Sequence, residues 1–139
     1  MNDKTIVRVR DVMKQEFDIV DGVATVAEAL RTMEHHETKS LIVNKRNDDD
    51  EYGIVLLSDI ARQVLAHNRS PERVNIYEIM SKPVVTVDPD MDIRYCARLF
   101  DKFGLSRAPV VESKKLLGVI SYADMVLKGL CRNTTRTSS

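Results

Sequence analysis

Two octapeptides decide the fold: GIVLLSDI at residues 53–60 and GVISYADM at residues 118–125. Each begins with glycine, continues as an apolar run and places an acid six positions after the glycine. An apolar run that ends in polar helix-start residues is typical of a strand-to-helix corner. The sequence therefore contains two related corners. They differ at one chemically important position, because Ser121 of the second corner stands where the first has Leu56.

The repetition extends upstream of the two octapeptides and covers most of the chain. The stretch VRDVMKQEFDIVDGVATVAEALRTM aligns with IYEIMSKPVVTVDPDMDIRYCARLF, and KSLIVN aligns with RAPVVE. Each copy opens with a β-branched run, predicted as a strand over residues 18–20 and over residues 84–87, and continues into an amphipathic helix. Thr25 and Glu28 give the first of these helices the T-x-x-E pattern of a capping box.

Two short apolar runs follow in each copy and predict a hairpin of buried strands, after which a second helix closes the copy. SLIV and YGIVLL flank one polar turn, and APVV and LLGVIS flank the other. The predicted unit is therefore β-α-β-β-α, present twice. A unit of about 60 residues is marginal as a free domain. We therefore expect an α+β fold in which the two repeats pack as one pseudo-two-fold domain.

The composition indicates a globular chain and limits its partners. Of 139 residues, 43% are hydrophobic and 30% charged, and no apolar run approaches the ~20 residues of a membrane span. Basic and acidic residues number 21 each, so the basic excess of a general nucleic-acid binder is absent. The charged N-terminus shows no signal-peptide core, and we expect a cytoplasmic protein. Cys96 and Cys131 lack C-x-x-C spacing, and Cys96 is predicted to be a buried thiol.

In this order and repetition, the motifs resemble a tandem pair of CBS domains, the module also called a Bateman domain. The resemblance rests on VRDVM and YEIM at the starts of the copies, on TVAEAL and SRAPVV, and on G-h-h-S-x-x-D at residues 118–124. It places one CBS repeat at residues 9–66, a polar connector at 67–75 and the other repeat at 76–130. Residues 131–139 have no apolar anchor and are expected to be a disordered tail.

The resemblance implies a stand-alone sensor and not an enzyme. CBS pairs bind adenosine-containing ligands in clefts between their repeats, so it implies AMP, ADP or ATP as a regulatory ligand, with NAD or S-adenosylmethionine as alternatives. It also implies a homodimer that signals to a separate effector protein, without a nucleic-acid or membrane partner. The alternative is a structural or protein-interaction module with non-functional clefts, which Leu56 favours. The motifs G-x-S-x-G, H-E-x-x-H and G-x-G-x-x-G and the Walker A glycine-lysine loop are absent from the sequence.

Ser121 and Asp124 are the strongest candidates for ligand contact. Their spacing is that of a capping box, and the same geometry suits a ligand. A helix N-terminus attracts phosphate, and a carboxylate can accept two hydrogen bonds from a ribose diol. The resemblance adds Val85, Thr86, Ser106, Arg107, Ala108 and Pro109 to this cleft. Arg107 is either a phosphate clamp or a solvated surface arginine, and Pro109 is expected to leave nearby carbonyls free for an adenine amine.

The cleft of the first copy departs from this pattern. Leu56 offers no side-chain donor to a phosphate, whereas Asp59 remains and Ser58 is expected to cap the helix. The aligned letters place Lys39 at the arginine position. This weaker second cleft is predicted to comprise Val20, Thr38, Lys39, Ser58 and Asp59. We expect it to bind weakly or to be empty.

Two other clusters do not match the spacing of metal ligands. His35 and His36 are adjacent, and adjacent residues do not face the same way on a helix. The acidic stretch NDDDE at residues 47–51 lacks the register of an EF-hand loop. The sequence therefore predicts no metal site, and a charged hairpin turn at residues 47–51.

Overall fold

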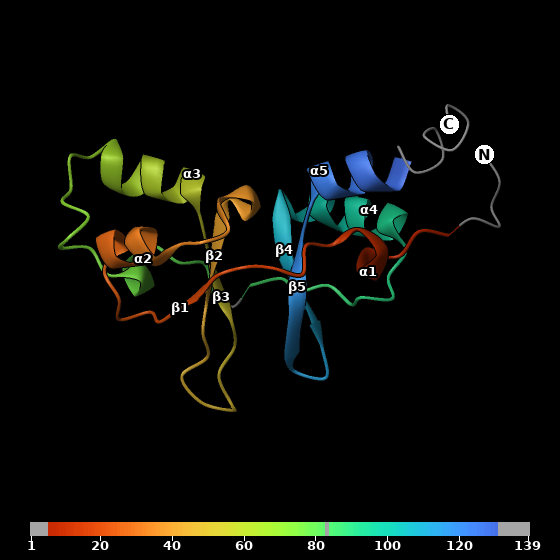
Figure 1. Cartoon of the computed structure of the whole chain (residues 1–139), viewed down its shortest axis with the longest axis horizontal. Helices are drawn as coiled ribbons and strands as arrows, with labels where there is room; N and C mark the ends of the chain where they lie inside the picture. The colour runs from red at the N-terminus through yellow and green to blue at the C-terminus, as the bar shows by residue number, and fades with distance from the viewer. Residues whose placement is uncertain (1–5, 83, 131–139) are drawn as a thin grey trace. The chain divides into compact units, whose positions relative to one another are not determined.

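The computed structural model describes residues 6–82 and 84–130 and divides the chain into two compact units (Figure 1). Of the described residues, the first unit comprises 16–82 and 84, and the second comprises 6–15 together with 85–130. The opening residues of the chain thus belong to the unit of the second copy. The repeat boundaries at 9–66 and 76–130 stay a prediction, and the tail at 131–139 and Cys131 lie outside the described residues.

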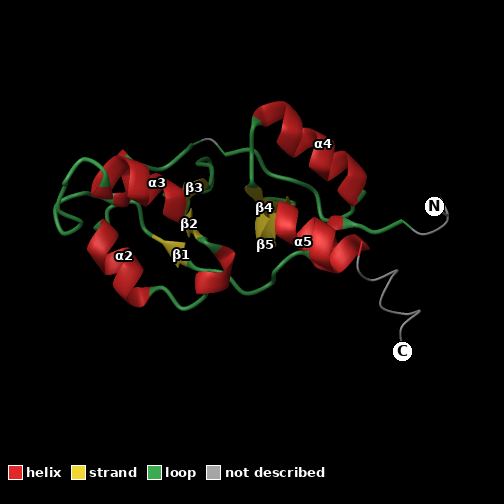
Figure 2. Cartoon of the chain, turned by 90° about the horizontal axis from the view of Figure 1, so that it is seen from above, coloured by secondary structure: helices red, strands yellow, loops and turns green. Residues whose placement is uncertain are grey.

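The first unit is a three-stranded sheet with helices packed beside it, as Figure 2 shows. Strand β1 runs parallel to β2, and β2 pairs antiparallel with β3, as a hairpin requires. The elements are β1 (Ile19–Val20), α2 (Val26–Thr32), η1 (His36–Thr38), β2 (Ser40–Val43), β3 (Gly53–Leu56), α3 (Leu57–Ile60), η2 (Ala61–Leu65) and η3 (Ile76–Glu78). The predicted β-α-β-β-α order is confirmed in this unit.

The second unit contains the other hairpin, formed by the antiparallel strands β4 and β5. Its elements are α1 (Val9–Val12), α4 (Ile93–Phe103), β4 (Arg107–Glu112), β5 (Lys115–Ser121), α5 (Tyr122–Asp124) and η4 (Met125–Leu130). Asp92 caps α4 by accepting from the backbone N–H of Arg94, and Gly104 ends the helix in the left-handed region with φ of 66°. Both units mix helices with strands, so the α+β class is confirmed.

The predicted strand over residues 84–87 is wrong in extent, and Pro109 supplies the physical reason. Only Val87 pairs, in a single parallel bridge with Val110. In the first unit, the N–H of Ile42 donates to the carbonyl of Asp18 and so extends the parallel ladder by one bond. Hairpin register places Pro109 where the first unit has Ile42. Because proline has no N–H, the ladder of the second unit does not continue back to Val85.

Each unit is completed by a segment that the repeats assign to the other copy. We call residues 7–14 the opening segment and residues 74–82 the linking segment. In the first unit, the linking segment donates from Ile76 N to Ala24 O at 2.9 Å; in the second, the opening segment donates from Val9 N to Met91 O at 2.8 Å. The same backbone contacts therefore occur in both units.

The repeated glycine of the two octapeptides allows these segments to lie against the hairpins. Lys14 forms an antiparallel bridge with Val119, and Ser81 forms one with Ile54. A Cβ atom added to Gly118 would lie 2.5 Å from the carbonyl oxygen of Lys14, too close for any side chain. Both copies thus have glycine at this position because another backbone segment crosses it closely.

The two hydrophobic cores join each hairpin to helices and to the incoming segment. In the second unit, Cys96 and Phe100 of α4 pack with Val9 and Val12 of the opening segment, and all four are at most 1% exposed. In the first unit, α2 and the strands pack with Ile76 and other residues of the linking segment. The predicted buried thiol at Cys96 is confirmed. Burial raises its pKa to about 11, because a thiolate is poorly solvated there.

Within residues 6–82 and 84–130, none of the helices has the length and apolar character that crossing a lipid bilayer demands.

Candidate ligand-binding site

The corner between β5 and α5 forms the capping box that the sequence predicts. Ser121 Oγ accepts from the backbone N–H of Asp124 at 3.2 Å. In return, Asp124 Oδ2 accepts from the backbone N–H and from the hydroxyl of Ser121, both at 3.0 Å. Three hydrogen bonds therefore fix the acid relative to the strand end, and both residues are buried.

The carboxylate of Asp124 is 3% exposed, and its other oxygen faces two lysines. The ammonium of Lys14 donates to Oδ1, and that of Lys128 lies 3.6 Å from the same atom. A buried carboxylate requires such compensation, because losing its hydration is costly. Lys14 belongs to the opening segment, and the sequence analysis missed it. No local pattern in the sequence indicates that this lysine meets Asp124.

Arg107 lies directly opposite Ser121 in the β4–β5 pairing and is half-buried. Burial lowers the pKa of its guanidinium, and the nearby charge of Asp124 opposes that shift. The neighbouring carbonyl of Ser106 accepts from the N–H of Tyr122 at 3.2 Å and so ties β4 to the start of α5. The structure therefore brings together four of the predicted residues, and Arg107 is not a fully solvated surface arginine.

The remaining predicted residues of this site lie in β4 or in the segment that directly precedes Val87. Ala108 and Pro109 are buried in β4, Val85 is half-buried and Thr86 is exposed. Val87 N donates to the carbonyl of Pro109 at 3.0 Å, which brings the two segments side by side. Because Pro109 lacks an N–H, it leaves the carbonyl of Val85 without its ladder donor. That this carbonyl accepts from an adenine amine stays a prediction.

The corner of the first unit is built differently. Its helix begins at Leu57, so Leu56 occupies the N-cap and no side chain caps the helix. The expected cap by Ser58 is wrong, because Ser58 is already inside the first turn. Asp59 accepts from the N–H of Leu56 at 2.8 Å and pairs with Arg62 at 2.8 Å. The carboxylate is thus held by its own helix and is 13% exposed.

Hairpin register corrects the alignment of this corner by one residue. Ser40 pairs with Leu56 as Arg107 pairs with Ser121, so Ser40 and not Lys39 stands at the arginine position. Lys39 is exposed, with φ of 55°, and its carbonyl accepts from Leu57 N. The sequence alone does not reveal this one-residue shift, because the apolar residues of KSLIVN and RAPVVE align equally well in either register.

The other first-corner residues are satisfied locally, with one exception. Thr38 is buried and donates to the carbonyls of His35 and Ser40, and Val20 is half-buried in β1. Ser40 Oγ is the exception: it is buried and has no hydrogen-bond partner among the described residues. Leaving a hydroxyl unpaired costs roughly 1–3 kcal/mol. The first corner therefore retains one buried polar atom that a ligand hydrogen bond would satisfy.

No group of three or more histidine, cysteine or acidic side chains in the described parts of the chain is arranged to hold a metal ion. In the NDDDE turn, Asp50 differs from its neighbours because it is half-buried and paired with Lys82 and Arg46. The acidic turn at residues 47–51 is therefore partly built into the first unit.

Comparison with known proteins identifies relatives across nearly the whole chain. Residues 9–66 and 76–129 match the family model described as CBS domain. The solved hexameric CBS-CP12 protein from bloom-forming cyanobacteria is 34% identical, with a TM-score of 0.84, and the match covers 95% of this chain and 86% of that chain. The CBS domain pair of protein MJ0100, solved with 5′-methylthioadenosine and S-adenosyl-L-methionine, is 23% identical with a TM-score of 0.73, covering 96% and 99%.

Among curated proteins, the uncharacterized protein MK0525 of Methanopyrus kandleri is 31% identical over 113 residues, 78% of this chain. The chain spans 57% of the length of MK0525 and 62% of the length of two further curated relatives.

Proposed function

This chain belongs to the CBS domain family, and from that premise we propose that it is a regulatory binding module. It takes an adenosine-containing ligand at the β5–α5 corner of the second unit and performs no catalysis. AMP, ADP and ATP are the leading ligands, and NAD and S-adenosylmethionine are the alternatives. The module works in the cytoplasm as a homodimer and passes ligand occupancy to a separate effector protein.

The buried carboxylate of Asp124 is the observation that carries this proposal. Ser121 holds one of its oxygens, and the other faces the ammonium of Lys14. A ribose diol donates two hydrogen bonds to a carboxylate of this kind, and Arg107 beside it supplies a bidentate partner for a phosphate. The carbonyl of Val85, which Pro109 leaves without a ladder donor, accepts from the adenine amine.

Ligand binding at this corner requires Lys14 to move. Its ammonium occupies the carboxylate oxygen that a ribose hydroxyl would use, and its side chain is 24% exposed, so it has room to leave. A phosphorylated ligand gives the displaced ammonium a new anionic partner. Because Lys14 lies in the opening segment, its release changes a contact that holds that segment. Occupancy is thereby coupled to the N-terminal part of the chain, by the differential affinity of the ligand for the two arrangements.

Two relatives support parts of this proposal. The MJ0100 pair was solved with 5′-methylthioadenosine and S-adenosyl-L-methionine, which are both adenosine derivatives. The cyanobacterial CBS-CP12 protein is hexameric, which supports self-association. The competing function is a structural or protein-interaction module. Leu56 favours it, because the first corner has no side-chain cap and pairs Asp59 with its own helix.

Calorimetry and thermal shift with adenosine, AMP, ADP, ATP, NAD and S-adenosylmethionine separate the two functions. A ligand present at 100 times its Kd stabilises the folded state by about 2.7 kcal/mol. Absence of a shift with all of them would leave only the structural module.

Variants of the two acids locate the site. Asp124→Ala should weaken adenosine binding about ten- to a hundredfold, because hydrogen bonds to a charged group contribute about 1.5–3 kcal/mol. Asp59→Ala is the matched control and should lose much less. Lys14→Met removes the competing ammonium and should tighten adenosine binding several-fold while weakening the preference for ATP over adenosine. Equal losses for both aspartates would contradict the assignment to the second unit.

A further inference from the structure

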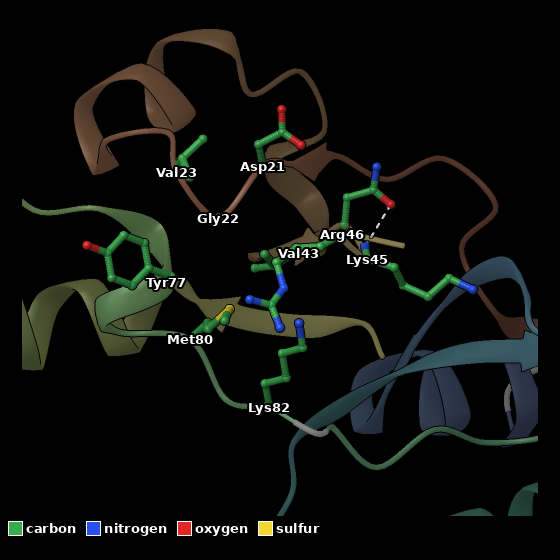
Figure 3. Close-up of a pocket in the computed structure, with 10 residues that line it drawn as sticks. Asp21, Gly22, Val23, Val43, Lys45, Arg46, Tyr77, Met80 and Lys82 are labelled. Atoms are coloured by element: carbon green, nitrogen blue, oxygen red, sulfur yellow. Dashed lines mark hydrogen bonds between the residues drawn. The ribbon is translucent and has the colours of Figure 1, made fainter. Parts of the chain in front are cut away.

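The first unit contains a pocket far along the strands from the Asp59 corner, at the carboxyl ends of β1 and β2 (Figure 3). Its volume is about 650 Å³, enough for a small metabolite. Three stretches of chain form its walls: the turn after β1, the end of β2 with the start of the hairpin loop, and the linking segment. The lining residues are Asp21, Gly22, Val23, Val43, Asn44, Lys45, Arg46, Tyr77, Met80 and Lys82.

Two cations in this pocket share a single carboxylate. Arg46 Nε and Lys82 Nζ donate to the same oxygen, Oδ2 of Asp50, at 3.2 and 2.6 Å. The hydrogen bond from Lys82 holds the pKa of Asp50 far below its usual range, so the acid is ionised at any physiological pH. One negative charge therefore faces two positive charges, and an excess positive charge remains beside the pocket.

The arrangement of these side chains leaves donors available to a ligand. Figure 3 shows the guanidinium of Arg46 and the ammonium of Lys82 lying next to each other, whereas the carboxylate of Asp21 points away from them. Arg46 uses its Nε for Asp50, and no acceptor among the described residues takes its terminal Nη groups. An arginine fork beside a lysine is a favourable arrangement for a phosphate, which accepts bidentate and point-charge contacts together.

Other residues of the lining are apolar or aromatic. Val43 and Met80 are the aliphatic contributors, and the ring of Tyr77, which is 54% exposed, forms the rim. The Arg46 side chain is 82% exposed and that of Lys82 is 17% exposed, so the cations lie at the mouth of the pocket and beside its apolar lining. This combination suits a small molecule that carries both a phosphate and an uncharged body.

The charges at the equivalent place in the second unit are paired differently. Tyr77 and Arg10 make the same backbone hydrogen bond in the two units, which fixes the correspondence. Arg10 pairs there with Asp90 at 2.9 Å and lies 3.7 Å from Glu112. One cation thus meets two acids in the second unit, where the first unit places two cations on one acid. The sharing of one carboxylate by two cations is therefore not repeated around Arg10 in the second unit.

We propose that this pocket of the first unit binds the phosphate group of a small phosphorylated metabolite, at a site separate from the adenosine corner. Arg46 and Lys82 hold the phosphate, and Asp50 keeps the two cations together while the site is free. A phosphate that arrives takes over part of the role of Asp50 as their counter-ion.

Isothermal titration calorimetry with inorganic pyrophosphate tests the site, because pyrophosphate has no ribose to engage the Asp124 corner. At low ionic strength we expect saturable binding that weakens as salt is added. Arg46→Ala and Lys82→Gln should each weaken it about tenfold. Asp50→Asn should strengthen it, since the variant removes the competing negative charge. Arg69→Ala changes the net charge equally, outside the pocket, and should leave the affinity within about twofold of the unmodified chain.

The signs of these effects decide the matter. Loss of affinity in Asp50→Asn would show that Asp50 only fastens the hairpin loop to the linking segment, and it would overturn the proposal. Equal losses in Arg69→Ala and Arg46→Ala would reduce the binding to general electrostatics, and absence of saturable binding would also overturn it. Adenosine titrations on the same variants should be unchanged, so failure here is distinguishable from failure at the Asp124 corner.

Discussion

The two units share their backbone contacts and differ in the side chains at both ends of their strands. Corresponding hydrogen bonds join the linking segment to the first unit and the opening segment to the second. At the helix corner, however, Ser121 and Arg107 of the second unit correspond to Leu56 and Ser40 of the first. At the other end, two cations share Asp50 in the first unit, whereas Arg10 lies beside two acids in the second. Duplication has therefore preserved the scaffold, which depends on backbone geometry, and left the binding chemistry of each unit free to diverge.

The largest effect that this comparison predicts concerns the two repeated glycines. A Cβ at Gly118 would meet the backbone oxygen of Lys14 at 2.5 Å, whereas one at Gly53 would meet Met80 Sδ at 3.1 Å and Ser81 O at 3.2 Å. Backbone yields less readily than a methionine side chain. Gly118→Ala should therefore destabilise the chain by about 3 kcal/mol and Gly53→Ala by about 1 kcal/mol, measured by urea unfolding.

Gly22→Ala serves as the control, since its nearest neighbours would lie at 3.5 Å or beyond, in ordinary contact. If Gly118→Ala proved as mild as Gly22→Ala, the opening segment would not lie against β5 as described, and the shared scaffold would be in doubt.

The next test compares the two helix starts. Ser121→Ala removes two hydrogen bonds to the buried Asp124, one of which is the cap of α5, so it should cost about 2 kcal/mol. Leu56→Thr adds a cap to α3 while removing half-buried apolar surface, and these effects should cancel to within about 1 kcal/mol. Thermal unfolding of both variants, with circular dichroism as readout, measures the difference. A loss in Leu56→Thr as large as that in Ser121→Ala would mean that capping does not distinguish the corners.

The elements of each copy could be predicted from sequence because their signals are local. Thr25 and Glu28 form the predicted capping box, with Glu28 N donating to Thr25 Oγ1 at 3.1 Å, and Cys96 is buried as its helical spacing indicates. The pairing of Ser121 with Asp124 was equally readable, since capping residues lie three positions apart.

Contacts between segments that are distant in sequence could not be predicted in this way. Lys14 meets Asp124 only because the opening segment packs on the second hairpin, and no local pattern states which copy it joins. The same limit explains the one-residue slip at Ser40. Consecutive buried strand residues give no alternation, so apolar character alone does not fix the register.

The smallest expected effect concerns Pro109, which makes the first strand of the second unit shorter than that of the first unit. Pro109→Ala restores the N–H that Ile42 provides in the first unit, without adding volume to a buried site. That N–H should bond to the carbonyl of Val85 and extend the ladder, so hydrogen exchange at residue 109 should show a protected amide. A rapidly exchanging amide would show that something other than the proline shortens this strand.

If Val85 also accepts the adenine amine, the variant should weaken adenosine binding about three- to tenfold, because one neutral hydrogen bond contributes about 0.5–1.5 kcal/mol. Inosine, which lacks that amine, should bind both proteins equally, and an unchanged ratio of adenosine to inosine affinity would remove Val85 from the site.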